Sequence, residues 1–253
     1  MHRFASPAEF QRLSAVLLPL SVTVAVVTGI LGLYLALWDS PPDYQQGEAV
    51  RIMYVHVPAA WLSTFVYGFM ALCSASFLVW RHALADLLAR QAAPLGAGFT
   101  LLTLVTGMLW GKPMWGAWWV WDARLTSVFI LFLLYLGYMG LSASGEHDER
   151  TKISCAWLAI VGAINLPIIK FSVTWWHTLH QPASLLRLDG PHIAPSMLHP
   201  LLLLIACFSA LFVALLLKRV ETAMLEVKLR RKQIQRVARK NAILEGASHE
   251  IRA

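Results

Sequence analysis

The chain has few charged residues for its length. Only 14% of its 253 residues are Asp, Glu, Lys or Arg, whereas 58% are apolar. A soluble fold of this size would have to hide far too much apolar surface, so the composition excludes one. No stretch alternates apolar and polar residues with the period of two that a membrane barrel strand requires. The sequence therefore predicts an all-α integral membrane protein, because helices satisfy their own backbone hydrogen bonds in lipid.

Several motifs of redox and nucleotide chemistry are missing. The three cysteines, Cys73, Cys155 and Cys207, are isolated and lie in apolar stretches. Without a Cys-x-x-Cys, Cys-x-x-Cys-His or zinc spacing, they are typical of small buried side chains, not of a redox carrier or a covalent haem protein. The chain also lacks a phosphate-binding loop of the Gly-x-x-x-x-Gly-Lys-Ser/Thr type, so any energy from ATP must come from a partner.

Six apolar stretches are long enough to cross a bilayer. A spanning helix needs about 20 apolar residues, with a range of roughly 17–25. The predicted spans are Leu17–Leu37, Pro58–Trp80, Pro94–Trp110, Leu125–Leu141, Ile153–Ile169 and Ser196–Leu217. We therefore expect a six-helix membrane domain over residues 1–220, with both termini on the same side.

The distribution of basic residues predicts the orientation. The side that holds both termini carries sixteen of the Lys and Arg residues, and the other side carries five. Because basic residues favour the cytoplasmic side, we expect both termini in the cytoplasm. The loops 39–57 and 171–195 and the tryptophan-rich stretch described below would then face outward.

The remaining segment, residues 221–253, is a basic tail that mixes apolar and basic residues and is expected to be helical. It accounts for most of the net charge of +7. Two interpretations stay open: the tail lies on anionic lipid, or it docks to a cytoplasmic partner. Nucleic-acid binding is a poor explanation for this positive charge, because basic residues on the cytoplasmic side are already expected in a membrane protein.

A dense group of tryptophans marks one of the outward segments. Five of the eleven tryptophans fall within residues 110–122, which end on Asp122. If the segment is helical, Trp115, Trp118, Trp119 and Asp122 share one stripe of an amphipathic helix, and Trp121 points elsewhere. Gly111 and Gly116 would let a planar ligand approach the backbone. An aromatic belt at the lipid surface is the alternative interpretation, and Asp122 could simply cap the next helix or pair with Arg124.

Histidines gather at the same side of the predicted membrane domain. Five of the nine lie on or near the outer face: His56, His177, His180, His192 and His199. Neutral imidazole is a common ligand for iron and other transition metals. His56 stands at or just before the start of the second span, and His180 follows the fifth span, so the two can meet at one face of a bundle. A polar histidine hydrogen-bonded near the headgroups is the simpler alternative for each.

Arginines complete the pattern. Arg51 and Arg124 are two of only five basic residues on the outer side, and a guanidinium is a planar fork that suits carboxylates. A ligand with an aromatic face, an iron centre and two carboxylates would use the tryptophans, histidines and arginines together. Haem has this shape, whereas a zinc ion would need the histidines but not the tryptophans.

The run from Trp115 to Asp122 resembles the tryptophan-rich "WWD" signature of the haem-handling family of cytochrome c biogenesis. Its continuation through Arg124, the stretch from Tyr54 to Trp61 and the stretch from Thr178 to Pro182 are similar to the six-span maturation-C branch of that family. The resemblance runs through nearly all six spans. It implies haem b (iron protoporphyrin IX) at the periplasmic face of a bacterial inner membrane, with His56 and His180 as axial ligands. The ring would lie against a segment that includes Trp115, Gly116, Trp118, Trp119, Trp121 and Asp122.

The resemblance also implies partners and a division of labour. These partners are an ATP-binding subunit (A), its membrane subunit (B), a small single-span subunit (D) and a periplasmic haem chaperone (E), to which haem is delivered. The chain itself would orient haem for covalent attachment to the chaperone and would do no acid–base chemistry, so enzymatic activity is not expected.

Three other functions remain as alternatives. A cytochrome c synthetase of the wider family would attach haem itself, but such proteins generally have more spans. A transporter of haem or another solute would need polar groups at mid-membrane depth, of which the sequence offers few. A scaffold subunit would use the tryptophans only as an anchor.

Overall fold

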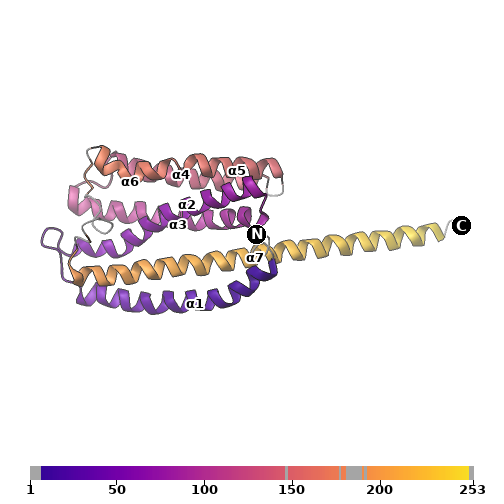
Figure 1. The fold of residues 1–253 in the computed structure, drawn as a ribbon, viewed down its shortest axis with the longest axis horizontal. Helices are drawn as coiled ribbons and strands as arrows, with labels where there is room; N and C mark the ends of the chain where they lie inside the picture. Colours follow the sequence, from indigo (N-terminus) through magenta and orange to yellow (C-terminus); the bar gives the residue numbers. More distant parts are fainter. Residues whose placement is uncertain (1–6, 146–147, 177, 181–189, 191–192, 251–253) are drawn as a thin grey trace.

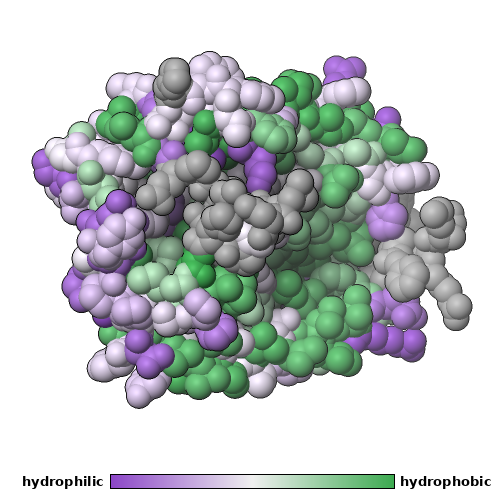
Figure 2. Space-filling model, turned by 60° about the vertical axis from the view of Figure 1, so that its left-hand side comes forward, coloured by the Kyte–Doolittle hydropathy of each residue, from purple (hydrophilic) through white to green (hydrophobic). Residues whose placement is uncertain are grey.

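The computed structural model describes residues 7–145, 148–176, 178–180, 190 and 193–250, and within these residues it is all-helical. Six helices or helix pairs are long and apolar enough to cross a membrane, with lengths from 22 to 42 residues. The predicted all-α fold with six spans is therefore confirmed. Figure 2 shows hydrophobic residues over much of the surface, as expected of a protein that contacts lipid.

The helices extend well beyond the apolar runs that predict them. They are α1 (Pro7–Tyr34), which continues as a π-helical turn (Leu35–Asp39), a 3₁₀ turn (Glu48–Ile52) leading into α2 (Met53–Trp80), α3 (Ala83–Trp115), α4 (Ala123–Ser144), α5 (Glu149–Gly162), α6 (Asn165–Trp175) and α7 (Pro195–Glu250). Helix α3 begins at Ala83, well before the apolar run that starts at Pro94, because good helix formers such as Ala, Leu and Arg carry it back. Apolarity marks only the part of a helix that faces lipid, so it underestimates helix length.

The fifth span is divided into α5 and α6. Proline at 167 has no backbone N–H, and its ring clashes with the carbonyl four residues earlier, at Ala163. The helix accordingly breaks at Ala163 and Ile164. The buried side chain of Asn165 crosses to α4 at this break, where its Nδ2 donates to the Ser127 carbonyl at 2.8 Å.

The helices pack in three groups. Figure 1 shows α1 beside α7, α2 beside α3, and α4, α5 and α6 together. Helix α1 begins at the same end of the bundle from which the far part of α7 projects, and we call this the tail end. We call the opposite end, which carries residues 39–52 and 112–122, the tryptophan end. Helix α7 passes residue 220 without a break, and the division into a membrane domain and a tail at this point stays a prediction.

Small residues let the central helices approach one another closely. In lipid, helix association depends on packing, not on the hydrophobic effect. Tyr135 of α4 lies directly on Gly96 of α3, where any added Cβ would come within 2.3 Å of the phenol ring. The Tyr135 hydroxyl then donates to the Ser63 carbonyl of α2 at 2.8 Å. This contact joins three helices and fixes the positions of α2, α3 and α4, which carry most of the site described next.

Candidate functional site

His56 lies in the first turns of α2 and faces α3. The expected position of His56 at or before the start of the helix is wrong, because α2 begins at Met53 and follows directly on a 3₁₀ turn. Its Nδ1 is 3.0 Å from the Thr106 hydroxyl, and its ring meets the Trp110 indole edge-on at 5.6 Å between centroids. Gly107 makes room for the ring, since an added Cβ there would lie 3.3 Å from His56 Cε1.

His180 is held by the start of α4. Its Nδ1 is 2.9 Å from Asp122 Oδ2, while Asp122 Oδ1 accepts a hydrogen bond from the Leu125 amide at 2.7 Å. Asp122 is thus the N-cap of α4, as the simpler sequence interpretation expected, and the partner of His180 as well. The ring of His180 also meets the Trp115 indole edge-on, with 4.9 Å between centroids.

The last turns of α3 connect the two histidines. Trp110 contacts His56 and Trp115 contacts His180, and both tryptophans belong to the same helix. His56 and His180 are near enough for a charge on one imidazole to act on the other. Residues 124 positions apart in the sequence therefore share one site at the tryptophan end.

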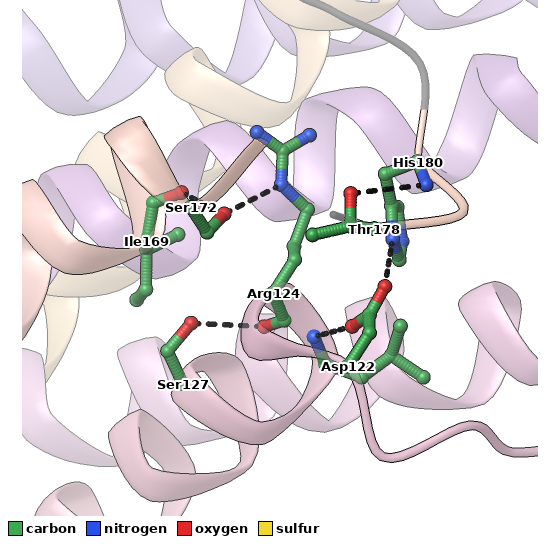
Figure 3. A network of polar contacts seen from close by, with 8 residues as sticks. Asp122, Arg124, Ser127, Ile169, Ser172, Thr178 and His180 are labelled. Carbon is green, nitrogen blue, oxygen red and sulfur yellow. Dashed lines mark hydrogen bonds and ion pairs between the residues drawn. The ribbon is translucent and has the colours of Figure 1, made fainter. Parts of the chain in front are cut away.

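Arg124 lies between these groups and α6. Its Nε donates to the Ser172 hydroxyl at 3.3 Å, and its charge acts on both histidines. Figure 3 shows its guanidinium in the space between Ser172 and His180. Arg124 and Asp122 interact through their charges, but the direct partner of Asp122 is His180.

The imidazole of His180 favours the neutral form. Burial lowers its pKa, and the Arg124 charge lowers it further, while the bond to Asp122 and the charge of that carboxylate oppose the shift. A neutral imidazole whose Nδ1–H is donated to a carboxylate has the Nε2 lone pair available as a metal ligand.

The tryptophan segment is not helical after Trp115. Gly116 adopts a left-handed conformation with φ of 75° and ends α3 as its C-cap. The expected helical stripe of tryptophans and Asp122 is therefore wrong, and the chain runs without a helix to Ala123. Close packing does not require a glycine at position 116, because an added Cβ there would meet nothing within 4 Å. The glycine is required by the left-handed conformation that ends the helix.

The indole rings of this segment point in different directions. Trp115 faces His180, and Trp119 packs against the core beside Phe129. Trp118 is 55% exposed under the ammonium of Lys112, and Trp121 is 73% exposed. Among the described residues, Trp110 contacts His56 and Trp115 contacts His180, whereas Trp118 and Trp121 are exposed rings that contact neither histidine.

Arg51 is not brought to the histidines by any contact of the described residues. Its Nε bonds Glu48 at 2.5 Å, and its Nη1 donates to the Ala36 carbonyl. These contacts tie the start of α2 to the end of α1. His177 and His192 lie outside the described residues, and the His199 side chain is exposed in the first turns of α7.

Sequence reasoning missed several members of the site. Trp110 was counted among the tryptophans but not as a neighbour of His56, and Gln46, whose Oε1 accepts from the Trp110 indole at 2.9 Å, was not considered. Thr106 is one of the few polar residues within the third predicted span. A buried hydroxyl in an apolar helix, about two and a half turns from its end, is a signal that could have placed it near a polar partner.

The arrangement suits a planar ligand that needs two nitrogen donors. In both histidines Nδ1 has a fixed partner, and Nε2 has no hydrogen-bond partner among the described residues. Two imidazoles with free Nε2 atoms, supported through Nδ1, form the donor set of a six-coordinate haem iron. Groups of three or more His, Cys, Asp or Glu side chains that could enclose a metal ion by themselves are absent from the described residues.

The fold and this site together define a multi-pass helical membrane protein with a paired-histidine site at one end of its bundle. A family model described as Heme exporter protein C matches residues 1–235. The chain therefore belongs to the haem exporter protein C family, whose role is haem handling in cytochrome c maturation.

Curated relatives agree along most of the chain. Heme exporter protein C of Bradyrhizobium diazoefficiens is 51% identical over 235 residues, which cover 93% of this chain and 89% of the relative. Heme exporter protein C of Haemophilus influenzae is 45% identical, with 94% and 97% covered. A putative cytochrome c biosynthesis ccmC-like mitochondrial protein of Marchantia polymorpha is 51% identical over 178 residues, with 70% and 75% covered.

Proposed function

We propose that this chain binds haem b at the periplasmic face of the bacterial inner membrane and delivers it to the periplasmic haem chaperone E. The observation that carries the proposal is the pair of imidazoles described above. His56 and His180 come from distant parts of the chain. Each has a hydrogen-bond partner at Nδ1 and none at Nε2 among the described residues. Each ring also has a tryptophan of α3 at its edge.

The proposed roles follow from these contacts. His56 and His180 would hold the haem iron, and Trp115 would contact the ring together with the rest of the segment, which comprises Gly116, Trp118, Trp119, Trp121 and Asp122. Arg124 binds a propionate, because its charge already acts on both histidines. Arg51 stays a prediction as a second propionate partner, since in this structure its guanidinium bonds Glu48 and Ala36.

Delivery depends on partners. Haem, when bound, would present a vinyl edge for attachment to the chaperone, and this chain would contribute orientation. Subunits A, B and D of the maturation system would supply ATP hydrolysis and the remaining membrane parts, because the sequence contains no phosphate-binding loop. The basic residues at the tail end support a cytoplasmic location for both termini.

A conducting path through the bundle is not favoured by the buried hydroxyls. The hydroxyls of Thr100, Thr103 and Ser63 each donate to a backbone carbonyl of their own helix, at 2.7–2.8 Å. Such groups are satisfied locally and do not need a passing solute. The exporter family membership likewise favours haem handling over synthetase chemistry.

The test is an absorption spectrum of the purified protein together with its copurified haem content. His56→Ala and His180→Ala should each lower the haem content and remove the spectrum of bis-histidine iron. His199→Ala is the matched control, because its side chain is exposed near the same end and should leave the spectrum unchanged. Wild-type spectra in both site variants would refute the ligand assignment.

Arginine variants separate the two candidate propionate partners. Arg124→Ala should weaken haem retention more than Arg51→Ala, since only Arg124 is placed beside the histidines. Equal retention in Arg124→Ala and the wild-type protein would remove the propionate role of Arg124.

A further inference from the structure

The hydrogen bonds of Thr106 determine which nitrogen of His56 carries the proton. A hydroxyl has one proton to donate. The Thr106 hydroxyl lies 2.6 Å from the Leu102 carbonyl, an acceptor only, so its proton points there. Toward His56 Nδ1, at 3.0 Å, the same oxygen can therefore only accept. This places the imidazole proton on Nδ1.

A second carbonyl of α3 supports the same assignment. The Thr106 hydroxyl also lies 3.3 Å from the Thr103 carbonyl, which, like the Leu102 carbonyl, can only accept. Whichever carbonyl takes the hydroxyl proton, the Thr106 oxygen faces His56 Nδ1 as an acceptor. Nε2 is therefore the unprotonated nitrogen of the neutral His56 imidazole.

The two histidines differ in the charge of their partners. His180 Nδ1 faces a carboxylate, whereas His56 Nδ1 faces a hydroxyl that is neutral and already shared with the backbone. A hydrogen bond from Nδ1–H to a carboxylate makes the imidazole more basic and a stronger donor to a metal. A neutral acceptor does so to a smaller extent.

We propose that Thr106 is a positioning residue that holds His56 in the Nδ1–H tautomer, and that its neutral hydroxyl makes His56 the more readily released of the two iron ligands. The inference rests on the proposed function, because it ranks the ligands named there. With haem bound, His56 would be the weaker ligand and His180, whose Nδ1 bonds Asp122, would be the stronger. Such an order suits a protein that must release its cargo.

The first experiment uses the protein without haem in lipid nanodiscs. Nitrogen-15 NMR of labelled histidines should show His56 with a protonated Nδ1 and an unprotonated Nε2. Thr106→Val and Thr106→Ala should produce a mixture of both tautomers, and Thr106→Ser should restore the wild-type signal. The His180 signal reports in each variant whether the fold is intact.

Thr103→Val provides the matched control. Thr103 is a buried threonine of the same helix, and its hydroxyl donates to the Phe99 carbonyl without facing a histidine. The His56 signal should not change in this variant. A wild-type His56 protonated on Nε2, or Thr106 variants that leave its signal unchanged, would overturn the role of Thr106.

The second experiment ranks the ligands in the haem-loaded protein. Carbon monoxide should displace one histidine from ferrous iron, and after photolysis resonance Raman spectroscopy reports the iron–nitrogen stretch of the histidine that remains. Asp122→Glu keeps a carboxylate for His180 Nδ1 but changes its position, so it should shift this band, and Thr106→Val should not. Thr106→Val should also weaken haem binding by about fivefold, the scale of one neutral hydrogen bond. The opposite pattern of band shifts would mean that His180 leaves first and would overturn the ranking.

The two failures can be told apart. A protein with the expected His56 tautomer that binds no haem would refute the proposed function and, with it, the ranking of the ligands. A protein that binds haem through both histidines but has His56 protonated on Nε2 before loading would refute only the role of Thr106.

Discussion

At the scale of single residues, Asp122 has one task for each carboxylate oxygen. Oδ1 caps α4 through the Leu125 amide, and Oδ2 receives the His180 Nδ1–H. The side chain is almost fully buried, so water cannot readily replace either hydrogen bond, and losing one costs free energy of folding. Asp122 couples the start of a spanning helix to the orientation of a histidine on a distant loop.

Asparagine at this position should separate the two tasks. In Asp122→Asn the single amide oxygen can still cap α4, because Asn is as good an N-cap as Asp. The amide nitrogen then faces His180 Nδ1 as a donor, which favours the Nε2–H tautomer that cannot ligate iron. We expect near wild-type thermal stability with strongly reduced haem content. Asp122→Ala should lose haem and also about 1 kcal/mol of stability.

Scanning fluorimetry and the haem spectrum of the same samples check this prediction. Full haem content in Asp122→Asn would show that the carboxylate does not set the tautomer of His180. Equal stability of the Ala and Asn variants would show that the cap contributes nothing measurable.

How much of the site could be predicted depends on the residue. His56, His180 and the tryptophans could be found from the sequence because histidines and tryptophans are concentrated on one side of the predicted spans. The bonds of Thr106 and the shared carboxylate of Asp122 could not, because they depend on the register between α2 and α3 and on how the chain after α6 returns to α4. Sequence spacing gives neighbours along one helix, but it does not give the register between two helices.

At the scale of elements, the end of α3 is set by backbone conformation more than by apolarity. Gly116 ends the helix at φ of 75°, and its amide bonds the Lys112 carbonyl at 3.0 Å. The left-handed region is open to glycine at no steric cost but costs other residues roughly 1 kcal/mol or more. Without this turn α3 could continue along its axis and carry the tryptophan segment away from α4.

Gly116→Ala should therefore reduce the stability of the folded protein by about 1 kcal/mol through backbone strain alone, since its Cβ would meet nothing within 4 Å. Gly98→Ala is the matched control. Its Cβ would also meet nothing, but Gly98 lies in the interior of α3, where alanine is favoured over glycine. Unfolding in a denaturing detergent measures both variants. A Gly116→Ala protein as stable as the Gly98→Ala protein would contradict the role of the turn.

The existence of the helices could be predicted from the sequence, but the residues at which they begin and end could not. Runs of apolar residues located all six spans, because an apolar segment in lipid must satisfy its backbone hydrogen bonds internally and therefore forms a helix. The break before α6 could have been inferred from proline at 167, which lies inside the fifth predicted span. The loss of helix after Trp115 was harder to predict, since a glycine inside a periodic pattern can also continue a helix.

At the scale of the whole molecule, close packing joins α1 to the remainder of the bundle. Added Cβ atoms at Gly29 and Gly32 of α1 would lie 3.0 Å from Cys207 Sγ and 2.9 Å from Leu204 Cγ of α7. Helix α1 is otherwise exposed, with many large apolar residues open to lipid. The first and last spans thus form a pair, and both termini leave from the tail end (Figure 1).

The orientation of this bundle in the membrane can be tested with single cysteines. Tyr44 is 91% exposed at the tryptophan end, and Leu225 is 54% exposed where α7 leaves the bundle. In the topology expected from the sequence, the side that holds both termini carries sixteen basic residues and the other side five. This distribution predicts that the tail end is cytoplasmic. In a background with Cys73, Cys155 and Cys207 replaced, an impermeant maleimide should label Tyr44→Cys in intact spheroplasts. Leu225→Cys should react only after the membrane is opened. Reversed labelling would place the histidine pair in the cytoplasm, where a periplasmic chaperone cannot reach it, so this measurement decides whether the site faces the compartment that its proposed function requires.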